Sequence, residues 1–411
     1  MGIKLGGLAR RAGFILDERK KDQAMILVDS GDYFFRDISM LGLEAHQLKK
    51  KAEILADAAK AFGYDVVVPG EADLATGLGG YKDLVKAAGV HPICANLQVG
   101  NQRVFDATAV RDVGGVKIGF TGVLQTNRPL PQEGSAPVVL ADIEPALKAA
   151  VEELKGKKCD LIVAITHIGF EFDREIAKKV PGIDIIIGGH SRESLGIGSV
   201  YEHTTIYQSG MQGKYFGHVH VTVSDPGPDG KRTLVKQSGE LHEMGPSRPE
   251  NAEWAKVIKD YHVWVDEQNK NKKVDPKDVQ ANTGDDIYWG AELCGQCHLK
   301  QDKWWKSTVH SHAYETLVKV NKQNDVECLA CHTTAFAQTR TRPGVKSLTD
   351  VTGLESVQCE SCHAAGSRHN APEIRSRATM RDTCIKCHDP KNSPKFEFAT
   401  FLPRMRCPSG N

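Results

Sequence analysis

The chain has 411 residues, enough for two or more domains that each bury a core. Its 53 Lys and Arg nearly balance its 52 Asp and Glu, so the formal net charge is +1 at pH 7. This balance leaves no global field that would attract nucleic acid or anionic lipid. No run approaches the roughly 20 apolar residues of a membrane-spanning helix. We therefore expect a protein that neither binds nucleic acid nor spans a membrane.

Residues 1–245 alternate apolar, strand-like runs with helical periodicity, a pattern typical of an α/β domain. The predicted strands cover residues 24–28, 65–68, 115–121, 160–167 and 183–190, and a helix is predicted at residues 41–61. The last two of these strands end in His167 and His190, and the first runs into Asp32 through Asp29-Ser-Gly. Because α/β proteins place their chemistry at strand ends, we expect functional residues there.

Farther along, residues 225–230 predict a hairpin turn between two strands. His218 and His220 alternate on one face of the strand before that turn. Two imidazoles at this spacing can chelate a metal, although an exposed strand explains them more simply.

Residues 246–287 are predicted to join two domains. Pro249 and Glu250 open a predicted helix, and the stretch from Glu267 to Asp286, rich in Asn, Lys and Asp, predicts a polar linker. The apolar residues of the helix recur every three or four positions: Trp254, Val257, Ile258, Tyr261, Trp264 and Val265. The second domain is then residues 288–411.

Four copies of Cys-x-x-Cys-His lie in this second domain. Two thiols add to the vinyl groups of a porphyrin and the next imidazole lies under the iron, so each copy predicts a covalent c-type haem. Zinc also binds paired cysteines, but a zinc site does not require His directly after every second Cys. The predicted haem-binding residues are Cys294, Cys297, His298, Cys328, Cys331, His332, Cys359, Cys362, His363, Cys384, Cys387 and His388.

Four haems in so short a domain are expected to form most of its hydrophobic core, wrapped by short helices and loops. Eight of the 11 cysteines belong to the four motifs. The other three, Cys94, Cys159 and Cys407, show no spacing pattern and are predicted to be buried spectator thiols.

The sixth ligand of each iron decides its chemistry. A second histidine gives a saturated iron suited to electron transfer, whereas an empty position can bind a substrate. The histidines outside the motifs in this domain are His310, His312 and His369, three candidates for four irons. Each could instead contact a haem propionate or solvent, and both alternatives stay open here.

Residues 304–314 and 359–369 resemble the multihaem cytochromes c of the hydroxylamine-pathway tetrahaem type, and the resemblance covers about residues 291–390. In that family three haems have two histidine ligands and one has an open or weakly ligated face. The resemblance implies that His369 and either His310 or His312 are distal ligands. It also implies redox partner proteins, such as other cytochromes.

Residues 6–223 are similar to the metallophosphoesterase domain of 5'-nucleotidases and the related thiosulfohydrolases. The blocks that carry this resemblance are residues 7–11, 27–32, 95–97, 166–169, 180–184 and 187–190. Such enzymes hold a phosphate between two divalent metals bridged by an Asp, which activate a water. The resemblance assigns Asp32 to the bridging carboxylate and His167 and His190 to metal ligands.

The ligand set departs from the pattern of that family. Its Asp-x-His element, expected before Gly6, is absent from the sequence, and Gly70-Glu71-Ala72-Asp73 replaces its Gly-Asn-His-Glu block. Arg192 stands where the second His of Gly-His-x-His is expected. The remaining ligands, with Glu71 as a substitute carboxylate, would hold one divalent ion. We expect a degenerate scaffold that docks or orients the haem domain, with little phosphohydrolase activity.

The expected fold is thus an α/β metallophosphoesterase-like sandwich followed by a mainly helical and coil tetrahaem cytochrome c domain. Covalent haem attachment predicts a periplasmic or extracellular location, although residues 1–5 lack the apolar region of a signal peptide. The numbering then begins after a removed leader, or the N-terminus is truncated. The sequence is compatible with a monomer or a homo-oligomer.

Three functions are compatible with these observations. The favoured one is an electron carrier with four covalently bound haems, in which the irons relay single electrons between redox partners. The second is an oxidoreductase acting on a small nitrogen or sulfur oxyanion at an under-ligated haem, and the third is a metal-dependent phosphoesterase with a haem accessory domain.

Overall fold

A computed structural model describes residues 5–37, 45–130, 132–133, 136–228, 230–273, 286–336, 345–369, 377–389 and 392–408. The chain divides into two compact units, the first of residues 1–40 and 48–258, the second of residues 41–47 and 259–411. The division falls within α6 (Ala252–Lys270), and so within the region predicted to join two domains. The predicted boundaries at residues 245 and 288 stay predictions, and most of the predicted linker, residues 274–285, lies outside the described residues.

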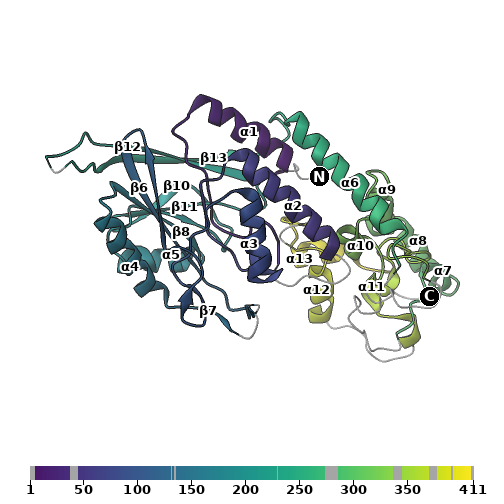
Figure 1. The fold of residues 1–411 in the computed structure, drawn as a ribbon. Helices are drawn as coiled ribbons and strands as arrows, with labels where there is room; N and C mark the ends of the chain where they lie inside the picture. Colours follow the sequence, from purple (N-terminus) through teal and green to yellow (C-terminus); the bar gives the residue numbers. More distant parts are fainter. Residues whose placement is uncertain are drawn as a thin grey trace. The chain divides into compact units, whose positions relative to one another are not determined.

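The first unit is built around a six-stranded sheet in the order β10-β11-β9-β8-β6-β5 (Figure 1). Its strands are β5 (Thr108–Val113), β6 (Val116–Leu124), β8 (Leu161–His167), β9 (Ile185–Gly188), β10 (Ser194–Tyr201) and β11 (Thr204–Ser209). The four inner strands are parallel, and β5 and β10 pair antiparallel at the edges. Every residue of β8 is buried, because helices or strands cover both faces, and such strands read as continuous apolar runs.

Two helices, α4 (Ile143–Gly156) and α5 (Phe170–Lys179), cover one face of this sheet. Leu147 and Leu154 of α4 are buried in one cluster with Ile162 and Ala164 of β8. The apolar positions of α4 are spaced so that they form a single stripe on the helix. This stripe is what the helix buries against the sheet.

The other face packs against a second layer of strands. This layer holds the parallel pair β1 (Val28–Asp29) and β2 (Val66–Val67) and the hairpin of β12 (Tyr215–Val223) and β13 (Leu234–Glu243). Val163 and Ile165 of β8 share a buried cluster with Val66 and Val68. A further cluster unites α1 (Leu8–Lys21), α2 (Ala45–Phe62) and α3 (Gly77–Ala88) beyond this layer. The unit is therefore an α/β sandwich, as predicted.

Smaller elements complete the first unit. They are η1 (Ala72–Leu74) and a three-stranded sheet of β3 (Leu97–Val99), β4 (Gln102–Arg103) and β7 (Val138–Leu140). Cys94 and Cys159 are buried, as expected for spectator thiols, whereas Cys407 of the second unit is only half-buried.

Several predicted elements differ from the bounds that the sequence indicated. The strand predicted at residues 183–190 is β9, which ends at Gly188, so His190 lies after the strand rather than at its end. The strand predicted at residues 24–28 begins at Val28, because Ala24 N donates to Asp22 Oδ1 in a turn after α1 and Leu27 N donates to the side chain of Asp65. Helix α6 begins at Ala252 rather than at Pro249, because the Asn251 side chain accepts a hydrogen bond from Trp254 N and so caps the helix. The predicted hairpin turn joins β12 to β13, with Asp229 outside the described residues.

Apart from its share of α2 and α6, the described part of the second unit consists of short helices. They are α7 (Ala291–Gly295), α8 (Leu299–Lys306), η3 (Val309–His312), α9 (Ala313–Val318), α10 (Val326–His332), α11 (Cys359–His363), η4 (Gly366–Arg368), α12 (Arg377–Ile385), α13 (Phe398–Phe401) and η5 (Leu402–Met405). The described apolar cluster is small and contains Leu317, Val326, Leu329, Phe336, Leu348 and Val351. Helices this short depend on tertiary contacts for their stability.

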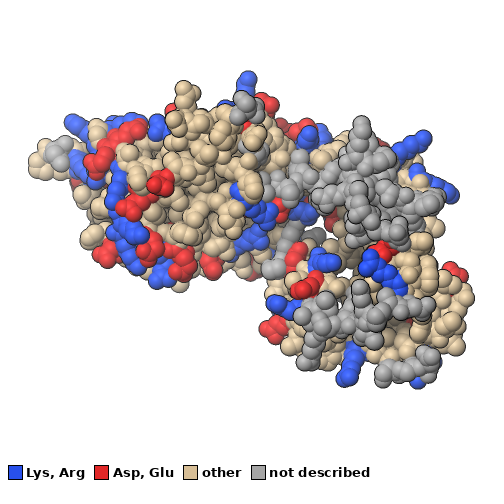
Figure 2. All heavy atoms as spheres, turned by 90° about the horizontal axis from the view of Figure 1, so that it is seen from below, with Lys and Arg blue, Asp and Glu red and all other residues tan. Residues whose placement is uncertain are grey.

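Charge and hydropathy of the folded chain agree with its composition. Acidic and basic side chains are interspersed on the face shown in Figure 2, in keeping with the formal net charge of +1. Within the described ranges, no helix combines the length and the apolar character needed to cross a bilayer.

Candidate functional site

Three side chains converge just beyond the carboxyl ends of strands from two sheets of the first unit. Glu71 follows β2, His167 ends β8, and His190 follows β9. The Glu71 Oε2 atom is 2.9 Å from His167 Nε2 and 3.2 Å from His190 Nδ1, and the two histidine nitrogens are 3.3 Å apart. These three residues, with Asp32, are called the front cluster below. The strand-end histidines predicted from the sequence therefore meet in space.

Asp32 completes the front cluster, with its Oδ2 atom 3.5 Å from His167 Nε2. The other ring nitrogen of His167, Nδ1, lies 2.6 Å from the carbonyl oxygen of Ser30. Because a carbonyl only accepts, Nδ1 carries a proton, and Nε2 is the atom that faces the carboxylates. Metal-binding histidines are oriented in this way by a second hydrogen bond. The predicted set Asp32, His167 and His190 is thus brought together.

The electrostatics of the front cluster favour a bound cation. Burial alone would lower the pKa of His167, but the hydrogen bond to Glu71 and the charges of Asp32 and Glu71 raise it to about 9. Burial opposes ionisation of Glu71, yet its hydrogen bonds to the two histidines lower its pKa. Burial raises the pKa of Asp32. Without a metal, a proton on His167 therefore offsets part of the negative charge of the carboxylates, and a divalent ion could replace that proton.

The donor set suits one divalent metal ion. Two imidazoles and two carboxylates are ligands that Zn²⁺ and Mn²⁺ accept. Ser191, which follows His190, is engaged elsewhere, because its hydroxyl donates to Gln208 Oε1 and accepts from Phe170 N. Arg192 is exposed and has a φ of 65°. Among the described residues, the four side chains of the front cluster therefore remain as ligands for one ion.

Asp73 positions the loop that carries Asp32. Its buried carboxylate accepts hydrogen bonds from the backbone N–H groups of Asp32, Phe34 and Gly70, at 2.8, 2.8 and 3.0 Å. Asp32 Oδ1 in turn accepts from Ala72 N at 2.8 Å. Burial and the charge of Asp32 raise the pKa of Asp73 to about 7. Sequence reasoning had treated Asp73 only as part of a replaced block, because its role depends on backbone groups 39 and 41 residues away.

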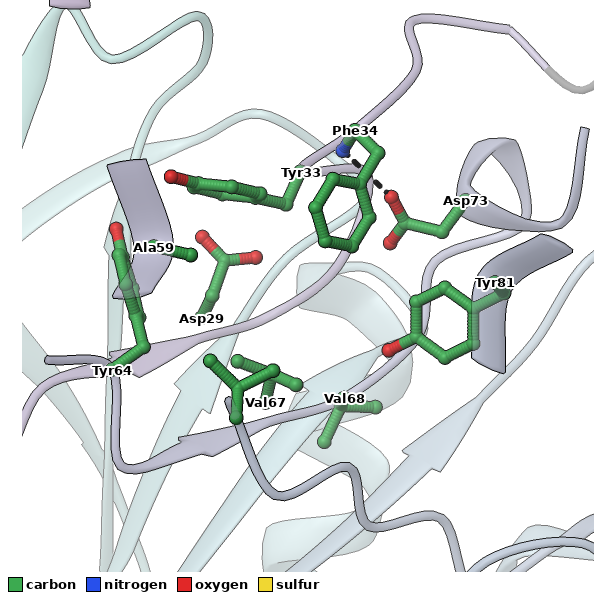
Figure 3. A pocket seen from close by; sticks show the side chains of 10 residues that line it. Asp29, Tyr33, Phe34, Ala59, Tyr64, Val67, Val68, Asp73 and Tyr81 are labelled. Carbon is green, nitrogen blue, oxygen red and sulfur yellow. Dashed lines mark hydrogen bonds between the residues drawn. The ribbon is translucent and has the colours of Figure 1, made fainter. Parts of the chain in front are cut away.

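A pocket lies beside Asp73, lined by Tyr33, Tyr64, Tyr81 and the carboxylate of Asp29 among others (Figure 3). Burial raises the pKa of Asp29 to about 6, against the opposing charge of Arg11. Arg11 also donates to the Tyr64 hydroxyl at 2.8 Å. The guanidinium of Arg11 thus offsets part of the buried charge of Asp29.

Replacing Asp73 with Asn should loosen the Asp32 loop. An amide offers one acceptor oxygen where the carboxylate offers two, and its NH₂ group would face a backbone N–H. We expect a loss of about 1–3 kcal/mol in the free energy of unfolding for each unpaired donor, together with weaker Mn²⁺ binding. Denaturant titration and calorimetry measure the two effects. Asp83→Asn, at an exposed position of α3, is the matched control, and equal effects of both variants would contradict this role.

The four Cys-x-x-Cys-His motifs lie on or beside short helices of the second unit. Cys294, Cys297 and His298 belong to the end of α7 and the residues after it. Cys328, Cys331 and His332 lie in α10, Cys359, Cys362 and His363 in α11, and Cys384, Cys387 and His388 at the end of α12 and after it. The structure places the first motif next to the third and the second next to the fourth. The thiols of Cys294 and Cys359 are in hydrogen-bonding contact, and so are those of Cys331 and Cys387.

Two motif histidines lie against histidines from outside the motifs. The ring centroids of His298 and His369 are 5.9 Å apart, and those of His310 and His388 are 6.0 Å apart. Two imidazoles that bind one metal from opposite sides through bonds of about 2.0–2.1 Å have centroids about 6 Å apart. Burial lowers the pKa of His310 and of His388, which favours the neutral form that binds iron. The separations of both pairs are compatible with two histidines that would hold one haem iron.

Two further histidines have fixed orientations. His332 Nδ1 lies 2.7 Å from the carbonyl oxygen of Ala313, so Nδ1 carries the proton and Nε2 can bind a metal. His312 Nδ1 lies 3.1 Å from a carboxylate oxygen of Glu315. The sequence named His310, His312 and His369 as candidates, but the partner of each could not be predicted, because His298 and His369 are far apart along the chain.

Comparisons with known proteins agree with both halves of this description. Residues 293–364 match the family model for cytochrome c554 and c-prime. The 5'-nucleotidase of Diplobatis ommata is 28% identical over 258 residues, which are 57% of this chain and 42% of that protein. The 5'-nucleotidase of Mus musculus is 26% identical over 287 residues, 64% of this chain and 48% of that protein. The matches thus span less than half of each of these relatives.

Solved structures show the same fold for the first unit. The sulfate thiohydrolase SoxB of Thermus thermophilus is 17% identical to this chain and superposes with a TM-score of 0.56. The match covers 66% of this chain and 49% of the SoxB chain. The calcineurin-like phosphoesterase YfkN of Bacillus subtilis is 21% identical to this chain and has a TM-score of 0.52. That match covers 64% of this chain and 90% of the YfkN chain. The first unit therefore has the calcineurin-like phosphoesterase fold and is similar in sequence to 5'-nucleotidases. Its front cluster is compatible with metal binding, and the cytochrome match implies haem c in the second unit.

Proposed function

We propose that this protein is an extracytoplasmic electron carrier that holds four haem c groups at its Cys-x-x-Cys-His motifs and passes single electrons between redox proteins. The observation that carries this proposal is the pairing of His298 with His369 and of His310 with His388. A haem with two histidine ligands supplies a one-electron iron couple without an open coordination position.

The protein side chains hold and orient the haems in this proposal. Cys294 and Cys297 form the thioether links of the first motif, and the corresponding cysteines do so in the other three. His369 and His310 are the distal ligands of the first and fourth motifs. The carbonyl of Ala313 keeps the Nδ1 proton on His332 and so directs Nε2 to the iron. The contact of Cys294 with Cys359 supports a close approach of the first and third haems, which favours outer-sphere transfer between them.

An electron paramagnetic resonance spectrum of the oxidised, haem-loaded protein tests this proposal. We expect low-spin signals for the His298–His369 and His310–His388 haems, and conversion of one low-spin iron to high spin in each of His369→Ala and His310→Ala. His312→Ala is the matched control and should leave both signals unchanged. A spectrum in which neither His369→Ala nor His310→Ala alters the low-spin signals would contradict the assigned pairs.

The same spectrum addresses the oxyanion reductase or oxidase alternative. A high-spin signal in the unaltered protein that shifts on addition of nitrite or cyanide would favour a substrate-binding haem over a pure relay.

A second candidate function is metal-dependent phosphoester hydrolysis by the first unit, with the haem domain as an accessory. The observation that favours it is the front cluster, in which Glu71 joins Asp32, His167 and His190 around a site for one ion. We propose that a single ion, without the second metal and the leaving-group acid of the related enzymes, leaves a scaffold with little activity. Hydrolysis of a generic phosphodiester with added Mn²⁺, abolished by His167→Ala, would establish the active alternative.

A further inference from the structure

The hairpin of β12 and β13 gathers three histidines and a glutamate on one face, outside the front cluster and the haem motifs. In its register His218 pairs with Glu240 and His220 pairs with Ser238. Paired residues of antiparallel strands, and residues two apart on one strand, point to the same side. His218, His220, Glu240 and His242 therefore share a face, and they are called the hairpin cluster below.

The opposite face of the hairpin packs against the six-stranded sheet. Val219 contributes to the buried cluster that includes β8. The face with the histidines turns toward α1, where the ring centroid of Phe14 is 4.8 Å from that of His242. Glu18 of α1 lies close enough to His218 to interact with it electrostatically. Hydrophobic contacts on both sides thus fix the strands that carry the hairpin cluster.

The ligand atoms of His218, His220 and Glu240 lie near enough to one another for a metal site, and His242 lies beside them. Glu240 Oε1 is 3.1 Å from His242 Nε2 and 3.6 Å from His220 Nε2. The rings of His218 and His220 are 4.0 Å apart, and the ligand atoms of His218, His220 and Glu240 all lie within 4.8 Å of one another. Ligands bound to a tetrahedral ion at about 2.0–2.1 Å are about 3.4 Å apart. His218, His220 and Glu240 would have to draw together to reach that geometry, and the His242 side chain would have to move from its place beside Glu240 to become the fourth ligand.

One nitrogen of the hairpin cluster makes no hydrogen bond with the residues that the structure describes. His242 Nε2 is buried, and its approach to Glu240 lacks the angle that a hydrogen bond requires. A buried nitrogen without a partner is unfavourable unless something else satisfies it. A metal ion held by Glu240 and its neighbours would do so. This observation distinguishes the hairpin cluster from a pair of solvated histidines on an exposed strand.

We propose that His218, His220, His242 and Glu240 form a binding site for one borderline divalent transition-metal ion, with Zn²⁺ the best match. Three imidazole nitrogens and one carboxylate oxygen are ligands that Zn²⁺ accepts in tetrahedral sites. The nitrogen majority disfavours Mg²⁺ and Ca²⁺, which prefer oxygen ligands. The ion joins β12 to β13 directly and so stabilises the hairpin.

Calorimetric titration of zinc chloride into the tag-free, haem-loaded full chain tests the hairpin cluster. The protein used for every titration carries His167→Ala, so that zinc bound at the front cluster does not add to the measured stoichiometry. We expect one zinc equivalent in this background, and an affinity weaker by at least about 100-fold after addition of His220→Ala or Glu240→Gln, because loss of a ligand exceeds the effect of losing an outer partner. The His220 side chain is 58% exposed, so its replacement should not disturb folding.

His203→Ala is the matched control, since His203 is an exposed histidine in the turn between β10 and β11. It should leave the zinc equivalent unchanged. Full affinity in both His220→Ala and Glu240→Gln, or an equal loss in His203→Ala, would overturn the proposal. So would the absence of a zinc equivalent in the background protein. Repeating the titration in a Glu71→Ala background guards against misfolding caused by His167→Ala.

Discussion

Protein produced without haem attachment should keep its first unit folded and lose the structure of its second. The described helices α7 to α13 span four to nine residues each. Isolated helices shorter than about 12–15 residues are marginal in water. The described apolar cluster of the second unit has six buried residues, too few to offset the ordering of a chain of this length. Bound porphyrins would supply the missing apolar surface.

Hydrogen exchange with mass spectrometry on the full chain measures this effect. We expect residues 286–336 and 345–369 to lose protection in a variant whose motif cysteines are replaced by alanine, while β6, β8 and β9 keep theirs. The haem-loaded chain is the reference, and its intact mass should exceed the polypeptide mass by four haems. Equal protection of the second unit with and without haem would show that side chains alone form its core.

His167→Ala should weaken binding of one divalent ion at the front cluster by at least about 100-fold, because it removes the most buried ligand. Binding should also depend on pH. The metal needs neutral His167, whose pKa is raised to about 9 by Glu71 and Asp32 against the effect of burial. Protons therefore compete below pH 9, and the apparent affinity should fall about tenfold per pH unit as the pH is lowered. It should level off above pH 9.

Calorimetric titration with Mn²⁺ between pH 6 and pH 10 measures this dependence, in a His220→Ala background that disables the hairpin cluster. Glu71→Gln serves as a second variant, since it keeps the size of the side chain but removes its charge, and it should weaken binding and flatten the pH dependence. His203→Ala is the control. A pH-independent affinity in the unaltered front cluster would contradict the role of His167 as a metal ligand.

The sequence by itself determined the elements that depend on local pattern. The apolar runs of β6, β8 and β9 were predictable because strands buried on both faces exclude polar residues over their whole length. The haem motifs were predictable because attachment needs two thiols and an imidazole within five consecutive residues. Strand ends identified His167 and His190 for a similar reason, because parallel strands place their carboxyl ends at one edge of a sheet.

Tertiary structure decided the features that join distant segments. Glu71 approaches His167 and His190 across about a hundred residues of sequence, and Asp73 is fixed by backbone groups of the Asp32 loop. The pairing of His298 with His369 and the addition of Glu240 and His242 to His218 and His220 depend on register and packing. Local patterns specify which side chains are available, whereas ligand sets require atoms within a few ångströms of one another, and only the folded chain sets those distances.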